Sequence, residues 1–320
     1  MSIVALNRIA FNKESSWGNP GATWQLIPVN PPTFTTTFEN ILDQGLRGVA
    51  VKDFGAFQGA GASEASLEGI FHPEHVGYMI SAIMGSPTSS GTATPYIHTF
   101  DFNSNAIVPS LAFEDYPAIG SPGVAPLGSA YQYTGLLCNN LTIKFNAGEG
   151  AVSWTASFMG KQGTVAPKVT VTTAGTAAPP FLGWEGSVLV DTITYQKLSD
   201  YEITFAREVA VEHAARASQQ PAFGYVGPLE VTLKATVDFS HEEDFARYRN
   251  NSQGTVKVMF TKGAKYMFID CPKTSFLEAP VELDRGGVSV KAAWSMRALY
   301  DVDVANTPCR ITLANGTPNY

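Results

Sequence analysis

The chain has 320 residues, a formal net charge of −7, 44 % hydrophobic residues and only 15 % charged residues. This length is typical of two domains of about 150 residues each. The acidic balance and the lack of any run rich in Lys and Arg exclude a protein that holds nucleic acid tightly. Because a monomer so short of charge is poorly protected from association, we expect partners to cover much of the surface; the alternative is a monomeric Gly/Thr/Ser-rich β-protein.

Short runs with Val, Thr, Phe and Tyr at alternate positions, bounded by Gly, Pro, Asn or Asp, predict an antiparallel β-protein. The clearest predicted strands are Thr33–Phe38, Leu141–Phe145, Val152–Phe158, Ile193–Phe205, Glu230–Val237, Thr255–Thr261 and Val288–Ser295. Two stretches predict helices. The first begins at His72-Pro73-Glu74, with Pro in the first turn, and ends at Gly85. The second begins at Ser240, where Glu243 completes a capping box, and ends at Asn250-Asn251.

The order of these elements predicts an internal repeat. Residues 66–71 precede the first helix and residues 232–237 precede the second, so two strand-then-helix units are offset by about 166 positions. Each unit is followed by a hairpin, one turning at Gly148-Glu149-Gly150 and the other at Asp284-Arg285-Gly286-Gly287. Aligning the hairpins at their turns matches Val152, Trp154, Ala156 and Phe158 with Val288, Val290, Ala292 and Trp294. These apolar residues alternate, as expected of half-buried strands.

A long loop is expected at the same place in each half, Leu42–Ala62 and Arg207–Gly227. Loops of this length without a binding role are uncommon. We therefore predict contacts between chains through these loops, with the candidate residues Arg47, Lys52, Asp53, Phe54, Phe57, Gln58, Glu208, Glu212, Arg216 and Gln219.

The domain boundaries follow from this repeat. We expect a first domain at 1–165 with an N-terminal arm over about 1–30, a linker at 166–180, and a second domain at 181–320 with a C-terminal arm over about 305–320. The predicted fold is mainly β, with two tandem copies of a β-barrel or sandwich domain that each carry one packed α-helix.

No catalytic, cofactor or metal site is predicted. The cluster His72-Pro73-Glu74-His75 lacks the HExxH spacing, so helix capping and a solvated surface explain it better than a metal. The glycines of residues 54–61 resemble a phosphate loop but no Lys-Ser/Thr follows them. Trp154 and Trp294 alternate with polar residues along their strands, which favours core packing over a sugar-binding platform.

The three cysteines, Cys138, Cys271 and Cys309, are far apart and fit neither a zinc site nor a disulfide framework. The apolar stretch Tyr78–Met84 is too short to span a bilayer, and the first residues lack a signal sequence. We therefore expect synthesis in a reducing cytoplasm and no membrane partner.

The stretch SLEGIFHPEHVGYMISAIMGSPTSSGTATPYIHTF, the following PSLAFEDY and the hairpin beyond it resemble the tail tube proteins of siphophages, in particular the branch with two copies of the tube domain in one chain. The resemblance covers roughly residues 30–304. It implies a structural virion protein, made in the host cytoplasm, that is not an enzyme and needs no cofactor. A tail terminator or baseplate hub protein of the same fold, and a carbohydrate-binding β-module, are the alternatives.

In that family, rings stack into a hollow tube that conducts DNA into the host. The resemblance implies that three two-domain chains complete a pseudo-hexameric ring, with the tape measure protein inside during assembly and the terminator and tip at the ends. Genomic DNA would pass without specific binding. The segment from Asp53 to Ile143 contains no Lys or Arg, so we expect an acidic channel wall, formed by the hairpins at 148–158 and 286–295, with Lys291 and Arg297 facing outward or paired with acids.

Overall fold

The computed structural model describes residues 7–45, 47–102, 108–117, 129–173, 178–191, 193–195, 198–238, 242–279, 281–283, 290–302 and 306–320. The fold is mainly β, as predicted. The first half contains β1 (Arg8–Ser16), β2 (Asn19–Pro20), β3 (Trp24–Leu26), β4 (Thr33–Asp43), β5 (Gly55–Ile70), α1 (Pro73–Met84), β6 (Thr88–Ser90), β7 (Tyr96–Asp101), β8 (Leu111–Tyr116), β9 (Ser129–Asn146) and β10 (Glu149–Gly160).

The remaining elements continue the β-rich pattern. They are β11 (Thr164–Pro167), β12 (Val171–Thr173), the 3-10 turn η2 (Gly183–Glu185), β13 (Gly186–Val190), β14 (Ile193–Tyr195), β15 (Leu198–Glu212), β16 (Phe223–Asp238), α2 (Glu242–Arg249), β17 (Gly254–Lys262), β18 (Lys265–Glu278), β19 (Val281–Leu283), β20 (Val290–Ala298) and β21 (Arg310–Asn315). Both predicted helices are present at their expected places, although the capping residue Ser240 lies outside the described residues.

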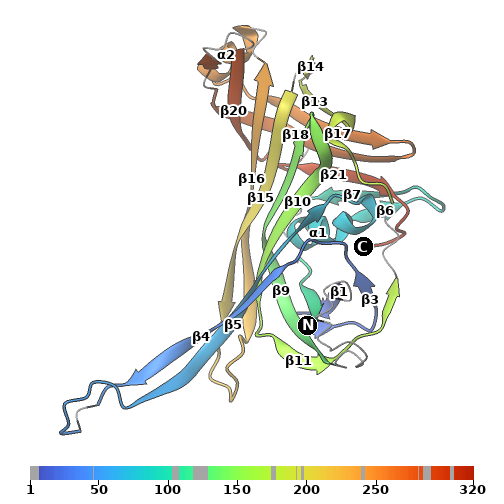
Figure 1. Ribbon diagram of the computed structural model, residues 1–320. Coiled ribbons are helices and arrows are strands. Elements are labelled where there is room, and N and C mark those ends of the chain that lie inside the picture. Colours follow the sequence, from blue (N-terminus) through green and yellow to red (C-terminus); the bar gives the residue numbers. More distant parts are fainter. Residues whose placement is uncertain are drawn as a thin grey trace.

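Eight antiparallel strands form what we call the central sheet, in the order β4-β5-β10-β9-β15-β16-β20-β18. Its long strands β9, β10, β15 and β16 run side by side along the molecule (Figure 1). The pairing of β9 with β15 joins the two halves, with Ile143 opposite Ile203. Because consecutive strand residues point to opposite faces, one face of this sheet carries apolar side chains and the other carries polar ones.

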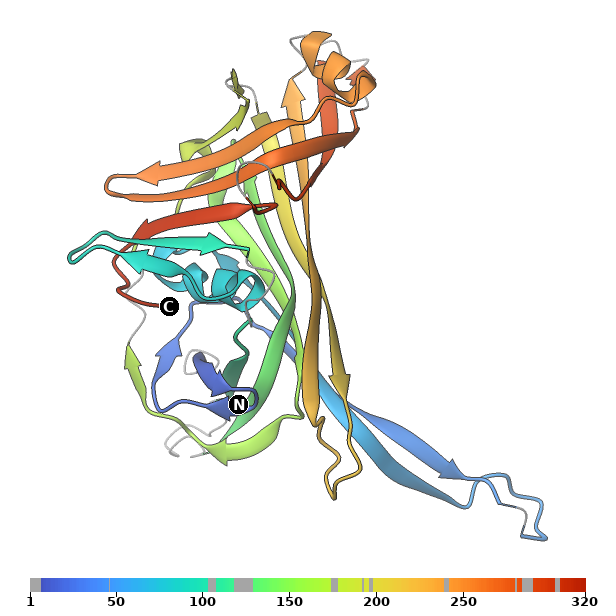
Figure 2. The same cartoon turned by 180° about the vertical axis from the view of Figure 1, so that it is seen from behind.

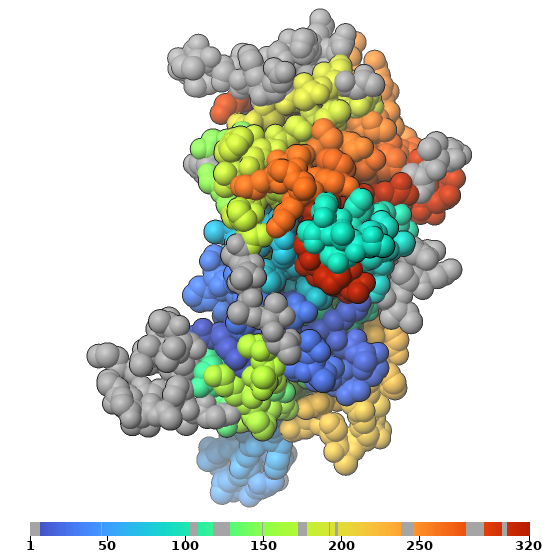
Figure 3. All heavy atoms as spheres, turned by 90° about the vertical axis from the view of Figure 1, so that its right-hand side faces the viewer, coloured from blue at the N-terminus to red at the C-terminus, as the bar shows by residue number. Residues whose placement is uncertain are grey.

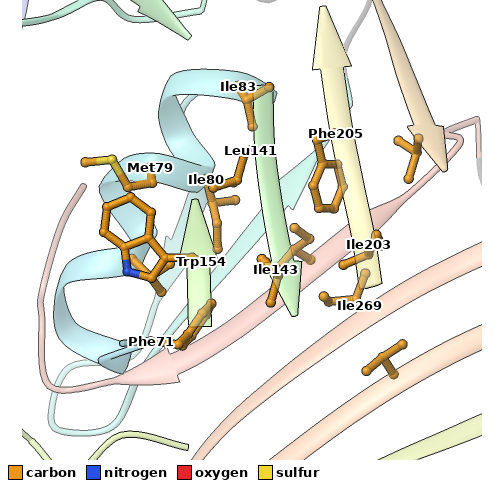
Figure 4. Close-up of a cluster of buried hydrophobic side chains, with 14 of the residues drawn as sticks. Phe71, Met79, Ile80, Ile83, Leu141, Ile143, Trp154, Ile203, Phe205 and Ile269 are labelled. Carbon is orange, nitrogen blue, oxygen red and sulfur yellow. The ribbon is translucent and has the colours of Figure 1, made fainter. Parts of the chain in front are cut away.

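The apolar face packs on helix α1, which is buried on nearly every side. The helix starts at Pro73. Proline lacks a backbone N–H, but the N–H groups of the first helical turn have no partner within the helix, so proline costs nothing there. The helix is followed by Gly85, whose φ of 108° favours glycine. A helix that is apolar all round belongs in a protein interior. Figure 4 shows side chains of α1 and the sheet directed toward one another, among them Met79, Ile80, Ile83, Leu141, Ile143, Trp154, Ile203 and Phe205.

The strand pairings of the two halves follow the same order. In the first half β5 pairs with β4 and β10, and in the second β16 pairs with β15 and β20. Trp154 lies opposite Gly69, and Trp294 lies opposite Ala235, which is 166 positions after Gly69. The turn-based alignment of Phe158 with Trp294 was therefore wrong by four residues. Lining up turns misplaced the strands because the stretch before β20 is longer than the turn before β10.

About half of each of the two expected long loops is strand. Residues 42–62 and 207–227 extend the hairpins β4–β5 and β15–β16, and only residues 44–54 and 213–222 connect the strands. The strands in these segments were not predicted, because the segments are rich in glycine and alanine, which have low β-propensity. The β4–β5 hairpin projects from the body as an arm, as Figure 2 shows.

The segments expected as linker and terminal arms also take part in the sheets. β11 pairs with β9 and β12 pairs in parallel with β3, so the linker region at 166–180 is partly strand. β1 pairs with β8, and β21 lies between β7 and β18. Figure 3 shows the red C-terminal residues directly against the teal segment of the first half. Both ends of the described chain therefore contribute to the fold.

The first predicted hairpin turn is present between β9 and β10, with Ala147 and Gly148 in the turn and Gly150 at a φ of 51°. The second predicted turn, Asp284 to Gly287, lies outside the described residues. The strands on its two sides, β19 and β20, do pair antiparallel, with Glu282 opposite Lys291. Trp154 and Trp294 are both buried, so the expectation of core packing is confirmed.

Candidate functional site

The polar face of the central sheet is a wide surface of short hydroxyl side chains and charges. Thr155, Thr142, Thr204 and Thr232 lie in one row across β10, β9, β15 and β16. Thr142 and Thr204 share a hydrogen bond of 3.1 Å between their Oγ1 atoms. The Thr142 and Thr204 hydroxyls therefore satisfy each other, and the row presents few strong binding groups.

Acidic side chains outnumber basic ones on this face. Alternation along the strands places these acids there: Glu39, Glu64, Glu68, Asp200, Glu202, Glu208 and Glu230. The basic residues of the face are Lys144, Lys234, Lys291 and Arg297. Most of these bases have acidic neighbours. The face is therefore net acidic. Lys144 and Lys234 were not predicted on it, because the expected wall comprised only residues 148–158 and 286–295.

Ion pairs neutralise several of these bases. Glu202 accepts from Lys144 at 2.7 Å and lies 3.9 Å from Lys234, so one carboxylate serves two ammonium groups. Arg297 pairs with Glu230 at 2.8 Å, as expected of a basic residue on this face. Lys291 is exposed and lies opposite Asp238 in the strand register. Exposed pairs of this kind contribute little to stability, but they do lower the local positive potential.

The β4–β5 hairpin brings together most of the candidate residues of the first half. The Arg47 guanidinium lies 4.7 Å from the ring centre of Phe54 and pairs with Asp43, while Gln44 donates to Asp53 at 2.7 Å. Lys52 is exposed. Large apolar side chains are also exposed on this arm, namely Ile41, Leu42, Val49, Val51 and Phe57. Such a patch on a projecting hairpin is typical of an interaction site.

The β15–β16 hairpin carries the remaining candidate residues. Glu208, Glu212, Arg216 and Gln219 are all exposed, and the Arg216 guanidinium donates to the Pro221 carbonyl at 2.8 Å. Near its tip the strand β16 exposes Phe223 and Tyr225, each by just over half of its surface.

The two hairpins touch through two of the predicted residues. Gln219 donates its Nε2 to the backbone carbonyl of Gln58 at 2.9 Å and accepts at its own carbonyl from the Gly61 N–H at 3.1 Å. Gln162 donates to the carbonyls of Gly61 and Gln219, at 3.3 and 3.0 Å. His213 lies 3.2 Å from the Gly61 carbonyl. The loop at 213–222 thus holds the base of the arm.

A groove of about 750 Å³ lies beside the first residues of β16. Residues 224–228 form one wall, and the side chains of Trp17, Phe102 and Arg207 contribute to the rest. The Arg207 guanidinium lies 5.4 Å from the ring centre of Phe102, and its buried Nε has no hydrogen-bond partner among the described residues. Burial lowers the pKa of Arg207. Sequence reasoning missed this arginine, because only the fold shows that it is half buried and short of partners.

The sequence was compared with models of known protein families. The sequence model of one family, the phage tail tube proteins, matches residues 5–318. The chain belongs to the phage tail tube protein family. No curated protein matches its sequence. A phage tail tube protein is a structural component of the virion tail that assembles with copies of itself and with other tail proteins, in agreement with the resemblance found in the sequence.

The described residues of this tail tube protein hold no group of three or more His, Cys, Asp or Glu side chains placed to bind a metal ion. His72 is hydrogen bonded to the Ala178 carbonyl at 2.9 Å, and His75 is buried in helix α1. No helix in the described ranges is long and apolar enough to cross a membrane. All three cysteines are buried thiols, and burial raises the pKa of Cys138 to about 12, which makes that thiol a poor nucleophile.

Proposed function

We propose that this chain is the major tail tube protein of a long-tailed, siphophage-type bacteriophage, with two tandem copies of the tube domain and three chains in each pseudo-hexameric ring. Stacked rings form the hollow tube that conducts DNA to the host. The first copy ends near residue 165 and the second begins near 181. The tape measure protein occupies the channel during assembly, and terminator and tip proteins close the two ends.

The observation that carries this proposal is the way the two halves share one sheet. Within the chain, β9 of the first half pairs with β15 of the second half. In the described chain, the outer edge strand β4 pairs only with β5, and residues 275–278 of β18 pair only with β20. An edge strand of one chain can therefore join the opposite edge of the next as β9 joins β15, which makes use of edges that would promote aggregation in a monomer.

The polar face of the central sheet is the proposed channel wall. Its threonine row offers no dense set of donors to phosphates, and its acids outnumber its bases. A strongly basic wall would release counterions from DNA and hold the duplex, whereas an acidic wall repels it within a Debye length of about 8 Å at physiological salt. Lys144 and Lys234 share Glu202, so the lysines on this wall do not form an isolated basic patch.

The exposed arm formed by β4 and β5 is the proposed contact between chains. An Asn-Gly turn in place of residues 44–54 connects Asp43 to Gly55, which are already paired partners, and removes Val49 and Val51 without opening the core. We expect the variant to be folded and monodisperse by circular dichroism and light scattering, yet unable to form tubes in negative-stain images. Normal tubes from this variant would contradict the role of the arm.

A further inference from the structure

Among the described residues, the tip of the β15–β16 hairpin contacts the β4–β5 hairpin, and this contact has no counterpart elsewhere. Strand β5 has a bulge between Gln58 and Gly61, where Phe38 pairs with Gly61 and Asn40 pairs with Gln58. The tip of the β15–β16 hairpin is seated on this bulge, with Gln219 bonded to both of its ends. We call this contact the latch.

Strand β16 has a bulge of the same kind between Val226 and Leu229, since Arg207 pairs with Leu229 and Val209 pairs with Val226. Both bulges contain a glycine pressed against a glutamate of the neighbouring strand. A Cβ atom on Gly59 would lie 3.1 Å from the Cβ of Glu39, and one on Gly227 would lie 3.2 Å from the Cβ of Glu208. The β15–β16 hairpin therefore has a bulge like the one on the β4–β5 hairpin that forms the latch.

In the described residues, no backbone hydrogen bond joins this second bulge to a segment other than β15. The groove beside it is lined by aromatic side chains and by the half-buried Arg207, whose Nε finds no partner in the part of the chain that the structure describes. Its chemistry suits an extended segment that carries an acid and small apolar side chains. A guanidinium with an unsatisfied N–H in a partly desolvated site gains most from a carboxylate.

We propose that the β16 bulge and its groove receive the tip of the β4–β5 arm, residues 49–53, from a second copy of this chain in the same ring. The two hairpin tips are similar in length, with connecting residues 44–54 and 213–222. The arm tip exposes Val49, Val51 and the carboxylate of Asp53, which matches the aromatic lining and Arg207. The inference rests on the proposed function, because it repeats the latch at each junction between neighbouring chains.

Site-directed cross-linking tests this placement. Lys52→Cys is combined with Pro228→Cys in the full chain, and assembled tubes are treated with a short bismaleimide; the native thiols are buried and do not compete. Cross-linked products separated under denaturing conditions should reach three chains and stop, since the contacts close within one ring. Pairing Lys52→Cys with Val165→Cys, an exposed position on β11, is the matched control and should give no ladder.

The outcomes separate this inference from the function on which it rests. Tubes that form normally but give no cross-link, either with Pro228→Cys or with Tyr225→Cys in its place, overturn the inference and leave the tube function intact. A ladder that continues beyond three chains also overturns it, because the arm would then join different rings. Failure of the unmodified protein to form tubes contradicts the proposed function itself.

Discussion

Trp154 and Trp294 occupy matching positions in the two halves of the central sheet, where each is 3 % exposed and lies opposite a small residue, Gly69 or Ala235. Trp154 donates its indole N–H to the Ile70 carbonyl at 3.2 Å, and Trp294 meets Tyr195 and Phe276 edge to face. Each ring fills the space at the base of its hairpin. The two positions therefore perform the same packing role in each half.

Replacing either tryptophan by alanine should lower the free energy of unfolding by about 3–5 kcal/mol, because a large buried aromatic side chain leaves a cavity. Trp184→Ala is the control, since Trp184 is 71 % exposed and its loss should cost less than about 0.5 kcal/mol. Guanidinium unfolding followed by circular dichroism measures all three. Nearly equal stabilities for Trp294→Ala and Trp184→Ala would contradict the assignment of Trp294 to the core.

The sequence allowed the fold class, both helices and the strand-then-helix repeat to be predicted, because apolar alternation and helix capping are local signals. Trp294 could not be aligned correctly, since the register depends on which strand pairs with β20. The hairpins were mistaken for loops because Gly59, Gly61 and Gly227 weaken the strand pattern. Gln58 and Gln219 were chosen as candidates, but that they touch each other depends on contacts over 161 positions.

The C-terminal residue Tyr320 packs against helix α1 at Gly77, where any side chain would overlap its ring. The ring also stands edge to face with Tyr78, at a centroid distance of 4.7 Å. We expect Gly77→Ala to destabilise the protein by about 1–3 kcal/mol through overpacking, although alanine is the better helix former.

Tyr320→Ala should cost about 3–5 kcal/mol alone and should remove the penalty of Gly77→Ala in the double variant. A double-mutant cycle from urea unfolding gives this coupling. Simple additivity of the two changes would show that Tyr320 does not contact α1.

Stability should fall as the solution becomes acidic, in part through His98. This side chain is fully buried, with Nδ1 2.7 Å from the Ser89 hydroxyl and Nε2 donating to the Thr317 carbonyl at 2.8 Å. Burial lowers the pKa of His98 below its ordinary 6.5, and the hydrogen bonds to Thr317 and Asn315 oppose this only in part. The folded state therefore binds the proton less well than the unfolded state, so stability is complete above pH 6.5 and is lost as the pH falls through the lowered pKa.

Urea unfolding of the unmodified protein between pH 8 and pH 5 should show this decline. His98→Gln should flatten part of it. An unchanged slope in His98→Gln would exclude His98 as a source of the acid sensitivity.

The charge of the polar face should decide how duplex DNA interacts with assembled tubes. Glu64→Lys combined with Glu68→Lys places two cations on the proposed channel wall, so tubes of this variant should retain DNA at low salt and release it as salt rises. Tubes of the unmodified protein should retain none. Asp270→Lys combined with Asp101→Lys, on β18 and β7 outside the polar face, is the charge-matched control in a co-sedimentation assay. Equal retention of DNA by both variants would contradict the assignment of the channel wall to this face.

The central claim is that two copies of one ring-forming unit lie in this chain, and image averaging of tubes assembled from the purified protein by cryo-electron microscopy tests it most directly. The account predicts rings of three chains, with six similar sheet segments around the channel and the polar face of the central sheet turned inward. Rings containing six chains, or a protein that stays monomeric at high concentration, would contradict it.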